Sequence, residues 1–596
     1  MAVGRKPSGA IRTDKVIQKQ KNGDRYVYER QSKYSPEKGY YVPISSICLG
    51  KMKPGSDDKN DLLPLRPKAK SSRVNESENL VKATRQHTGM IDIVKYISKK
   101  SGIEDELKSV ILDDEGLVQK ILTLAWYSFA TDGKSWTSVY PWSVKYNGQL
   151  PYEHTAISGD MYHDVFAKLG NDESIKQGIF EARVKDCGEC KLIALDSTTL
   201  VVESKRMGKC RKVKHKDGTF QKCVKVVFFY AIDARRPIAY AAIPGNVPDS
   251  RTVEYALQQL KGLPLDDAEL VHDNGYCTDG TICEMLVANR HFVTRIEADI
   301  SWVASEIEKY RDELEHGGEI VEYDPKLSGK MVKVTRTFSK RGRKKDDEVN
   351  SVTREVNLFI FFSSVNKAKD DVYFRETFMS YAKDLKLGKA LGEDRQAIET
   401  FAKKYMNIER DSDGKITKIT TQKKNYDKKL RYSGYIVLVA DQETDIESAL
   451  IKFRKREYIE EMIKNFEGHI GGKKTRVWDD DTFDGQLLVH FEALSMHETF
   501  ESKVNYMKTI LALPKGDKDH DKAETFKQER ELKKWVEQTS LHNILEWFDA
   551  VETVKVKSSD KAIEWTTSTS KRDQLFLKML GMGDEEEEKE EEKENS

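Results

Sequence analysis

The order of apolar segments in the middle of the chain constrains its fold more than any other feature of the sequence. Short apolar runs bounded by turn residues predict three consecutive strands, and the link between the second and third is short enough for a hairpin turn. Beyond them, runs with helical periodicity alternate with further strand-like runs. The predicted elements are strands at 191–201, 223–232 and 237–243, a helix at 250–261, a strand at 268–273, a helix at 279–289 and a strand at 291–296.

This order of elements predicts an α/β fold. Three antiparallel strands followed by alternating helices and strands is the order of an RNase H-like core. The order is interrupted at 298–430, where a strand-like stretch predicts a β-rich insertion. The apolar run Gly434–Val439 resumes the core as a strand, and a helix is expected at 446–466.

Three acidic residues stand on these core elements. Asp196 follows an apolar run in the first strand, Asp273 ends the fourth strand, and Glu460 lies inside the helix at 446–466. Taken singly, each acid has an ordinary explanation as a turn former, a helix cap or a solvated helix residue. Carried to one place by two strands and a helix, the three carboxylates would form a hard-metal site of the kind that cuts and joins phosphodiesters.

Magnesium is the cofactor that such a site predicts. Mg²⁺ takes oxygen ligands and keeps several waters, so three carboxylates suffice when a nucleic-acid phosphate supplies the rest. Two Mg²⁺ ions would activate the attacking oxygen and stabilise the leaving oxygen, and Mn²⁺ is expected to substitute for them. Because clustered carboxylates raise one another's pKa values, such a cluster is stable only with cations.

The sequence around Glu460 resembles the bacterial and archaeal DDE transposases of the insertion sequence four type. Their third-acid helix carries the signature Tyr-x2-Arg-x3-Glu-x6-Lys, and Phe453, Arg456 and Glu460 occupy its first three positions with the required spacing. Positions i, i+3 and i+7 lie on one helix face. The stretch Asp273–Tyr276 resembles the family's second-acid box, and residues 244–250, Pro-Gly-Asn-Val-Pro-Asp-Ser, resemble its Gly-Asn-x-x-Asp motif.

The third-acid helix departs from the family signature at two positions. Phe453 replaces the tyrosine, keeping the ring and losing the hydroxyl, and the lysine position falls at Glu467, which does not hold a phosphate. Lys464, one turn beyond Glu460, is expected to take over the phosphate contact. Glu461 competes with Glu460 for the metal, but it is rotated by about 100° around the helix and breaks the signature spacing.

The resemblance implies a DNA transposase that binds the ends of an insertion sequence and performs metal-dependent strand cleavage and strand transfer in cut-and-paste transposition. The three acids would be the catalytic and metal-binding residues, and the signature helix would grip DNA. Trp302 in the insertion could stack on an extruded base, although packing in the core is the commoner role of a tryptophan. The partners would be double-stranded DNA, as terminal inverted repeats and target, and a second copy in a homodimer that pairs the two ends.

Two other functions stay open. One is a catalytically silent or domesticated relative that binds DNA, and the other is an RNase H-like nuclease that hydrolyses without strand transfer. A P-loop ATPase is set aside because the sequence has no Gly-x4-Gly-Lys-Ser/Thr loop.

The charge of the chain is nearly balanced overall but divided between its ends. The net charge is +1, yet residues 1–85 hold nineteen Lys or Arg against nine Asp or Glu, a net charge of +10. The stretch 584–596 has nine acids and two lysines, a net charge of −7. A basic head is expected to neutralise DNA phosphates, and an acidic tail of this kind is usually disordered.

The remaining composition predicts a cytoplasmic, nucleoid-associated protein. No run of about 18 apolar residues is present, so no membrane span is expected, and the basic N-terminus lacks the apolar region of a secretory signal. Seven cysteines in a chain of 596 residues argue for reduced thiols. A zinc site remains open as the alternative for Cys187, Cys190, Cys210 and Cys223.

We therefore expect seven segments. A small N-terminal module with short strands at 14–50 and a helical domain precede the core, and a helical module follows it. The segments are a basic N-terminal DNA-contacting module at 1–75, a helical domain at 86–185, the first half of the core at 190–297, the insertion at 298–430, the second half of the core at 431–512, a helical C-terminal module at 513–582 and the acidic tail at 583–596.

Overall fold

The computed structural model describes most of the chain, which forms two compact units. One comprises Met1–Ala83 with Val556–Ile563, and the other comprises Thr84–Lys555 with Glu564–Ser596. The tail expected at 583–596 and residues 64–75 of the N-terminal module lie outside the described residues. These are 11–20, 23–35, 38–63, 82–188, 190–204, 206–214, 220–340, 350–388, 395–472, 474–475, 477–513, 522–557 and 562–582.

The first unit contains a small antiparallel sheet in the region where the alternation of residues predicts strands. The strands are neighbours in chain order, and Val27 and Met52 are buried between them. The rings of Tyr34 and Tyr41 meet edge to face with their centroids 5.4 Å apart. The strands are β1 (Ile11–Lys19), β2 (Arg25–Ser35), β3 (Tyr40–Met52) and β4 (Leu62–Leu63).

The second unit begins with helices, as the apolar periodicity predicts. Several start at a side chain that accepts a hydrogen bond from the first turn: Asp114 from Leu117 N–H, and Ser158 from Met161 N–H. The elements are α1 (Gly89–Ser101), α2 (Ile103–Val110), α3 (Glu115–Ala130), η1 (Trp136–Ser138), α4 (Val139–Lys145), α5 (Gly159–Asn171) and α6 (Glu173–Asp186), preceded by β5 (Lys82–His87).

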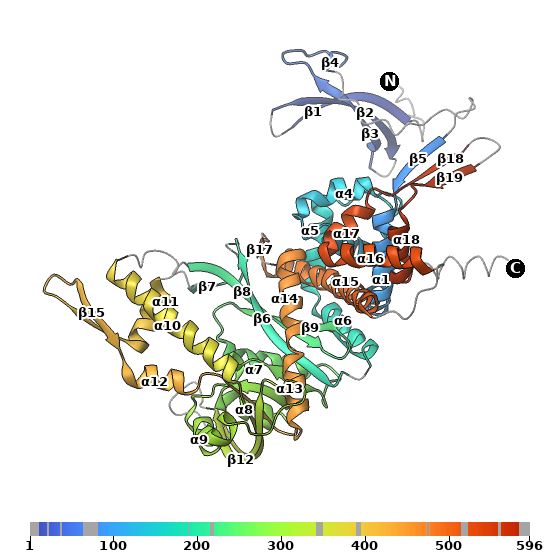
Figure 1. Ribbon diagram of the computed structural model, residues 1–596. Coiled ribbons are helices and arrows are strands. Elements are labelled where there is room, and N and C mark those ends of the chain that lie inside the picture. The colour runs from blue at the N-terminus through green and yellow to red at the C-terminus, as the bar shows by residue number, and fades with distance from the viewer. Residues whose placement is uncertain are drawn as a thin grey trace, which may run out of the picture. The chain divides into compact units, whose positions relative to one another are not determined.

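A mixed sheet of ten strands forms the centre of the second unit (Figure 1). Its middle has the spatial order β9-β8-β6-β10-β11, in which β6, β8 and β9 are antiparallel and β10 is parallel to both β6 and β11. The bounds are β6 (Leu192–Val202), β7 (Arg211–Lys214), β8 (Phe220–Ala231), β9 (Arg236–Pro244), α7 (Asp249–Leu260), β10 (Glu269–His272), η2 (Asn274–Tyr276), α8 (Asp279–Val287) and β11 (His291–Ile296).

The segment expected to be a β-rich insertion mixes helices and strands, so that expectation was wrong in part. Two of its strands, β12 and β13, extend the central sheet because β13 pairs with β16, the strand that resumes the core. Helix 301–315 packs on the main core, and the elements between 364 and 431 enclose a second core of Phe374, Phe378, Ala402, Tyr405 and Met406. The bounds are α9 (Ser301–Glu315), β12 (Ser328–Lys340), β13 (Asn350–Phe362), α10 (Ser364–Lys386), α11 (Arg395–Tyr405), β14 (Met406–Arg410), β15 (Ile416–Thr421), α12 (Lys423–Arg431) and β16 (Tyr435–Ala440).

The helix expected at 446–466 is in fact two helices, α13 (Ile446–Arg454) and α14 (Glu457–His469). At the break the backbone tightens, because Arg456 N–H bonds Phe453 C=O at 3.1 Å, an i→i−3 contact. The remaining elements are β17 (Lys474–Thr475), α15 (Asp480–Ala512), α16 (Lys522–Gln538), α17 (Leu541–Phe548), β18 (Glu552–Lys557), β19 (Ala562–Thr566) and α18 (Lys571–Leu580). The C-terminal module therefore contains two strands that the apolar periodicity did not predict.

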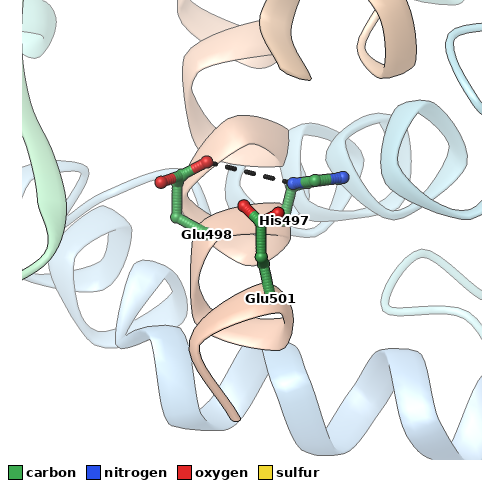
Figure 2. Close-up of side chains that lie close together, drawn as sticks. All are labelled: His497, Glu498 and Glu501. Atoms are coloured by element: carbon green, nitrogen blue, oxygen red, sulfur yellow. Dashed lines mark ion pairs between the residues drawn. The ribbon is translucent and has the colours of Figure 1, made fainter. Parts of the chain in front are cut away.

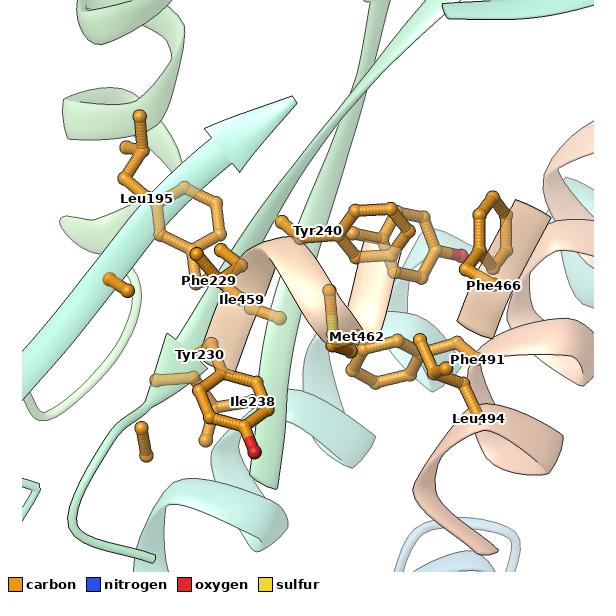
Figure 3. Close-up of a cluster of buried hydrophobic side chains, with 14 of the residues drawn as sticks. Leu195, Phe229, Tyr230, Ile238, Tyr240, Ile459, Met462, Phe466, Phe491 and Leu494 are labelled. Atoms are coloured by element: carbon orange, nitrogen blue, oxygen red, sulfur yellow. The ribbon is translucent and has the colours of Figure 1, made fainter. Parts of the chain in front are cut away.

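The main core lies between one face of the central sheet and the helices α14 and α15. Figure 3 shows Phe229 and Tyr240 from the sheet packed near Ile459, Met462 and Phe466 of α14. These side chains are all almost completely buried, and each contributes about 1.5–3 kcal/mol relative to an exposed position. This burial fixes α14 against the strand that carries Asp196. No helix among the described residues is both long and apolar enough to cross a membrane.

Candidate active site

Asp196 lies at the centre of β6, half-buried, in the middle of the sheet. Its Oδ1 accepts hydrogen bonds from the backbone N–H of Ser197 at 2.8 Å and from the Tyr276 hydroxyl at 3.1 Å. The Ser197 and Tyr276 hydroxyls are themselves 2.6 Å apart. One oxygen of Asp196 is therefore held by the protein.

Asp273 follows β10 directly. The parallel pairing of β10 with β6 runs as far as Val271, which lies opposite Ala194, and Asp273 and Asp196 each stand two residues beyond this last pair. Residues in register on neighbouring strands point to the same face, and the strands lie about 4.8 Å apart. The turn after Asp273 leads back to this position, because it carries Tyr276, whose hydroxyl contacts Asp196.

Glu460 reaches the same region through Arg456. The Arg456 side chain is only 12% exposed, with Nη1 3.5 Å from Asp196 Oδ2, and Nη2 pairs with Glu460 Oε1. Its guanidinium also lies over the Phe453 ring, 5.6 Å from the centroid. The break between α13 and α14 therefore places the aromatic, the guanidinium and the carboxylate of the predicted signature in one contiguous group.

The electrostatics of the site follow from burial and from this concentration of acids. Burial raises the pKa of Asp196, and the nearby Glu460 carboxylate acts in the same direction, while the Ser197 N–H and the Arg456 charge oppose the shift. His272 is fully buried, and burial lowers its pKa to about 4, with the Arg456 charge acting in the same direction. His272 is therefore neutral near pH 7.

The three predicted acids do not form the tightest acidic group of the protein. Among the described residues, one set of three His, Cys, Asp or Glu side chains has its ligand atoms all within 4.8 Å of one another, and that set is His497, Glu498 and Glu501 on α15. The structure thus joins Glu460 to Asp196 through a guanidinium and places Asp273 directly after β10, the strand paired with β6. Their oxygens are the hard donors that Mg²⁺ prefers, so the donor set fits that ion.

The other predicted DNA-contacting residues occupy different surroundings. Lys464 is exposed on α14. Glu467, at the lysine position of the signature, turns inward and accepts a hydrogen bond from Thr198 of β6. Trp302 is half-buried on α9, where the Arg336 guanidinium lies 5.0 Å from its ring centroid and the Phe338 ring lies at 6.3 Å.

Two contacts near the site were missed in the sequence. The Tyr276 hydroxyl holds Asp196. The only signal for this contact in the sequence is the position of Tyr276, three residues after Asp273. Lys225 of β8 is buried and donates to Asp249 Oδ1 and to the Val247 carbonyl, both at 2.6 Å. A lysine inside an apolar strand run was the available signal, because a buried lysine needs a partner.

The cysteines form two separate pairs. Burial and the Cys187 thiol raise the pKa of Cys190, and their hydrogen bond lowers the pKa of Cys187 to about 7. Cys210 directly precedes Arg211, which pairs with Cys223 across β7 and β8. All are free thiols, and in the described part of the chain no three of them come within 4.8 Å of one another, so the zinc alternative has no support here.

Comparison with known proteins matches the chain to a protein family and to solved structures. The model of the transposase DDE domain family matches residues 191–496. The chain matches none of the curated proteins with which it was compared. Among solved structures, a piggyBac transposase synaptic complex with hairpin DNA aligns with a TM-score of 0.29 and 7% identity, over 76% of this chain and 85% of that chain. At that TM-score the likeness carries no argument about this chain.

Proposed function

Because the chain belongs to the transposase DDE domain family, whose match spans just over half of its 596 residues, we propose that it cuts and joins DNA at the ends of an insertion sequence. In cut-and-paste transposition, a water oxygen attacks phosphorus and the P–O3′ bond breaks, leaving a 3′-hydroxyl. That hydroxyl then attacks a phosphodiester of the target. Both steps are in-line displacements and use the same site.

Asp196, Asp273 and Glu460 are the proposed catalytic carboxylates. The observation that supports this assignment most directly is the register of β6 and β10, because the pairing of Val271 with Ala194, continued by two residues, would set Asp273 opposite Asp196. Glu460 is tied to Asp196 through Arg456, and both pairings of that guanidinium are with proposed catalytic acids. The strand order β9-β8-β6-β10-β11, with its antiparallel and parallel pairings, supports an RNase H-like core around them.

Two Mg²⁺ ions held by these three carboxylates would activate the attacking oxygen and stabilise the leaving one. The protein prepares the site by fixing one side of Asp196. Ser197 N–H and the Tyr276 hydroxyl occupy Oδ1, while Oδ2 faces Arg456 Nη1 at 3.5 Å. Tyr276 thus acts as a positioning residue for Asp196.

Arg456 is the proposed phosphate contact of the third-acid helix, as in the insertion sequence four type. Its Nη1 and Nη2 face Asp196 and Glu460, and its Nε is buried without a hydrogen-bond partner among the described residues. A DNA phosphate would bind the guanidinium by replacing one of the carboxylate contacts. Phe453 supports the guanidinium, and exposed Lys464 on the same helix would hold a neighbouring phosphate.

The rest of the DNA would be bound by the other modules. The basic residues of 1–85 would neutralise phosphates of the terminal inverted repeats, and Trp302 would contact DNA from α9. Two element ends must be paired before joining, so the working form would be a homodimer on double-stranded DNA.

The function is tested with Asp196→Ala in a strand-cleavage and strand-joining assay on DNA that carries the inverted repeats flanking the gene, with Mg²⁺ or Mn²⁺. Cleavage should fall by about 10³-fold or more, because members of a cooperating catalytic set fail together, while gel-shift binding of the same DNA stays unchanged. Glu461→Gln is the matched control, since Glu461 is exposed beside Glu460 on α14.

Each alternative outcome identifies a different function. Cleavage that survives in Asp196→Ala would remove this carboxylate from the site. Binding without cleavage by the unaltered protein would identify a silent DNA-binding relative. Cleaved products without joined products would identify a nuclease.

A further inference from the structure

A second acidic cluster lies on α15, away from the proposed catalytic acids. His497 and Glu501 lie one turn apart on this helix, and Glu498 follows His497 directly. The ligand atoms of the three side chains all lie within 4.8 Å of one another. Figure 2 shows the imidazole of His497 and the two carboxylates directed toward one another, with His497 Nδ1 3.9 Å from Glu498 Oε1. The cluster thus combines one nitrogen donor with two oxygen donors.

His497 is buried without a hydrogen-bond partner. The residue is 5% exposed, and its Nδ1 has no partner among the described residues. The ring is held in place by stacking on His469, with centroids 5.5 Å apart and planes 9° apart, and His469 Nδ1 is 2.5 Å from Asp132. The ring therefore presents a fixed imidazole nitrogen that no described residue occupies, and imidazole is a common metal ligand.

Of the two carboxylates, that of Glu498 is buried and that of Glu501 is half-buried. Asn465 Nδ2 donates to Glu498 Oε1 at 3.1 Å and to Glu501 Oε2 at 2.7 Å, and the Tyr230 hydroxyl donates to Glu498 Oε2 at 3.2 Å. In the described part of the chain, neither carboxylate forms an ion pair with Lys or Arg, although the charge of Lys508 acts on Glu501. Two carboxylates this close together repel each other and favour a bound cation.

The cluster opens on a cavity that has room for an ion and its water ligands. The cavity has a volume of about 220 Å³, and His497, Glu501, His469, Asn465 and His542 line it. Nδ1 of His542, from α17, is also buried without a partner among the described residues. His497 and His542, each with one ring nitrogen unpaired among the described residues, thus line one polar space together with Glu501.

We propose that His497, Glu498 and Glu501 bind one divalent transition-metal ion, with Zn²⁺ the best-fitting ion, at a site separate from the catalytic acids. One imidazole nitrogen and two carboxylate oxygens with a water from the cavity make a four-ligand set typical of Zn²⁺, whereas Mg²⁺ prefers oxygen ligands alone. Zinc bonds of about 2.0–2.2 Å require only a small approach of the three side chains. Asn465 and Tyr230 orient the carboxylates from outside, as outer hydrogen-bond partners of metal ligands do.

The ion would brace the helix that carries Glu460. Asn465 lies five residues after Glu460 on α14 and bonds both carboxylates of α15. A metal that fixes these carboxylates therefore fixes the contact between α14 and α15. The proposed role is structural, because among the described residues the hydrogen bonds and ion pairs of the three ligands go to Asn465, Tyr230 and one another and not to Asp196, Asp273 or Glu460.

The test is the zinc content of the full-length protein after dialysis against buffer with millimolar Mg²⁺ and a small excess of Zn²⁺, measured by plasma mass spectrometry. The unaltered chain should retain about one Zn²⁺, and His497→Gln and Glu501→Gln should lose it, with affinity reduced by at least about tenfold. Glu461→Gln, an exposed acid close to both glutamates, is the matched control and should retain the ion. Asp196→Ala should also retain it.

Two outcomes would overturn the site. One is an unaltered protein that retains no zinc, which would mean that the glutamates share a proton instead. The other is zinc that is kept by Glu501→Gln and lost by Asp196→Ala. Circular dichroism shows whether each variant is folded. X-ray absorption of the zinc-loaded unaltered chain is independent of the variants, and a first shell without an imidazole nitrogen would contradict the proposal.

Discussion

Arg456 decides how the candidate catalytic side chains are arranged at the scale of single residues. Its two terminal nitrogens lie between Asp196 and Glu460, and its third nitrogen is buried and unpaired among the described residues. A guanidinium can make such divided contacts because its five N–H donors form a fixed fork, which a lysine ammonium does not. The same fork of donors suits Arg456 to bind carboxylates and, in their place, a phosphate.

Buried histidines make stability depend on pH, and His490 gives the clearest case. It is stacked on Trp136 with ring centroids 5.3 Å apart, and burial lowers its pKa to about 3. The unfolded chain binds the proton first, so this contribution to stability is complete above the unfolded value of about 6.5 and is lost as the pH falls toward 3. The loss is about 1.4 kcal/mol per pH unit for each such histidine.

His490→Gln should therefore lose less thermal stability than the unaltered protein when the pH is lowered from 7 to 5, as measured by melting temperature. His316→Gln is the control, because His316 is exposed at the end of α9 and should leave the pH dependence unchanged. Equal losses in the unaltered protein and in His490→Gln would contradict the assignment.

At the scale of elements, the connection from β9 to α7 depends on a close approach of two backbones. A Cβ added at Gly245 would lie 2.3 Å from the Cys223 carbonyl oxygen of β8. Because Gly245 has no side chain, the chain can leave β9 in close contact with the backbone of β8. This connection carries Asp249, which pairs with Lys225, so the motif has a structural role beside the site.

Gly245→Ala should destabilise the fold by about 1–3 kcal/mol, because the added methyl forces one of two paired strands to shift. Gly468→Ala is the matched control. Gly468 lies in α14 with open space around it, so this variant should be more stable than the unaltered protein by about 0.5–1 kcal/mol. The measurement is urea unfolding of both variants. A Gly245→Ala protein as stable as the unaltered one would show that β8 and β9 can separate at no cost.

At the scale of the molecule, a buried ionic network joins the helical domain to the two halves of the core. Arg183 of α6 is completely buried and pairs with Glu106 of α2 at 2.7 Å and with Glu492 of α15 at 2.6 Å. It also donates to Ser495 Oγ at 2.7 Å, and Arg236 of β9 pairs with Glu106. These elements lie far apart in the sequence, so the network forms only when the whole unit is assembled.

Arg183→Met should destabilise the protein by about 3–5 kcal/mol, because it leaves Glu492 as a buried charge without its partner. Arg183→Met combined with Glu492→Met should recover part of that loss, since the double variant removes both charges. Thermal unfolding at pH 7 measures both. A double variant no more stable than the single one would mean that packing, not charge, dominates this network.

The sequence by itself determined the central strands, the acids they carry and the spacing of Phe453, Arg456 and Glu460, because short apolar runs and helical periodicity are local properties. Only the tertiary structure decided which groups meet. The pairing of β10 with β6 makes neighbours of the strand that carries Asp196 and the strand that precedes Asp273, the break before α14 turns Arg456 toward Asp196 and Glu460, and β13 joins the central sheet instead of forming a separate domain. Each depends on pairing between distant segments, whose energy comes from burial and charge neutralisation in the assembled chain. No local pattern encodes those contacts.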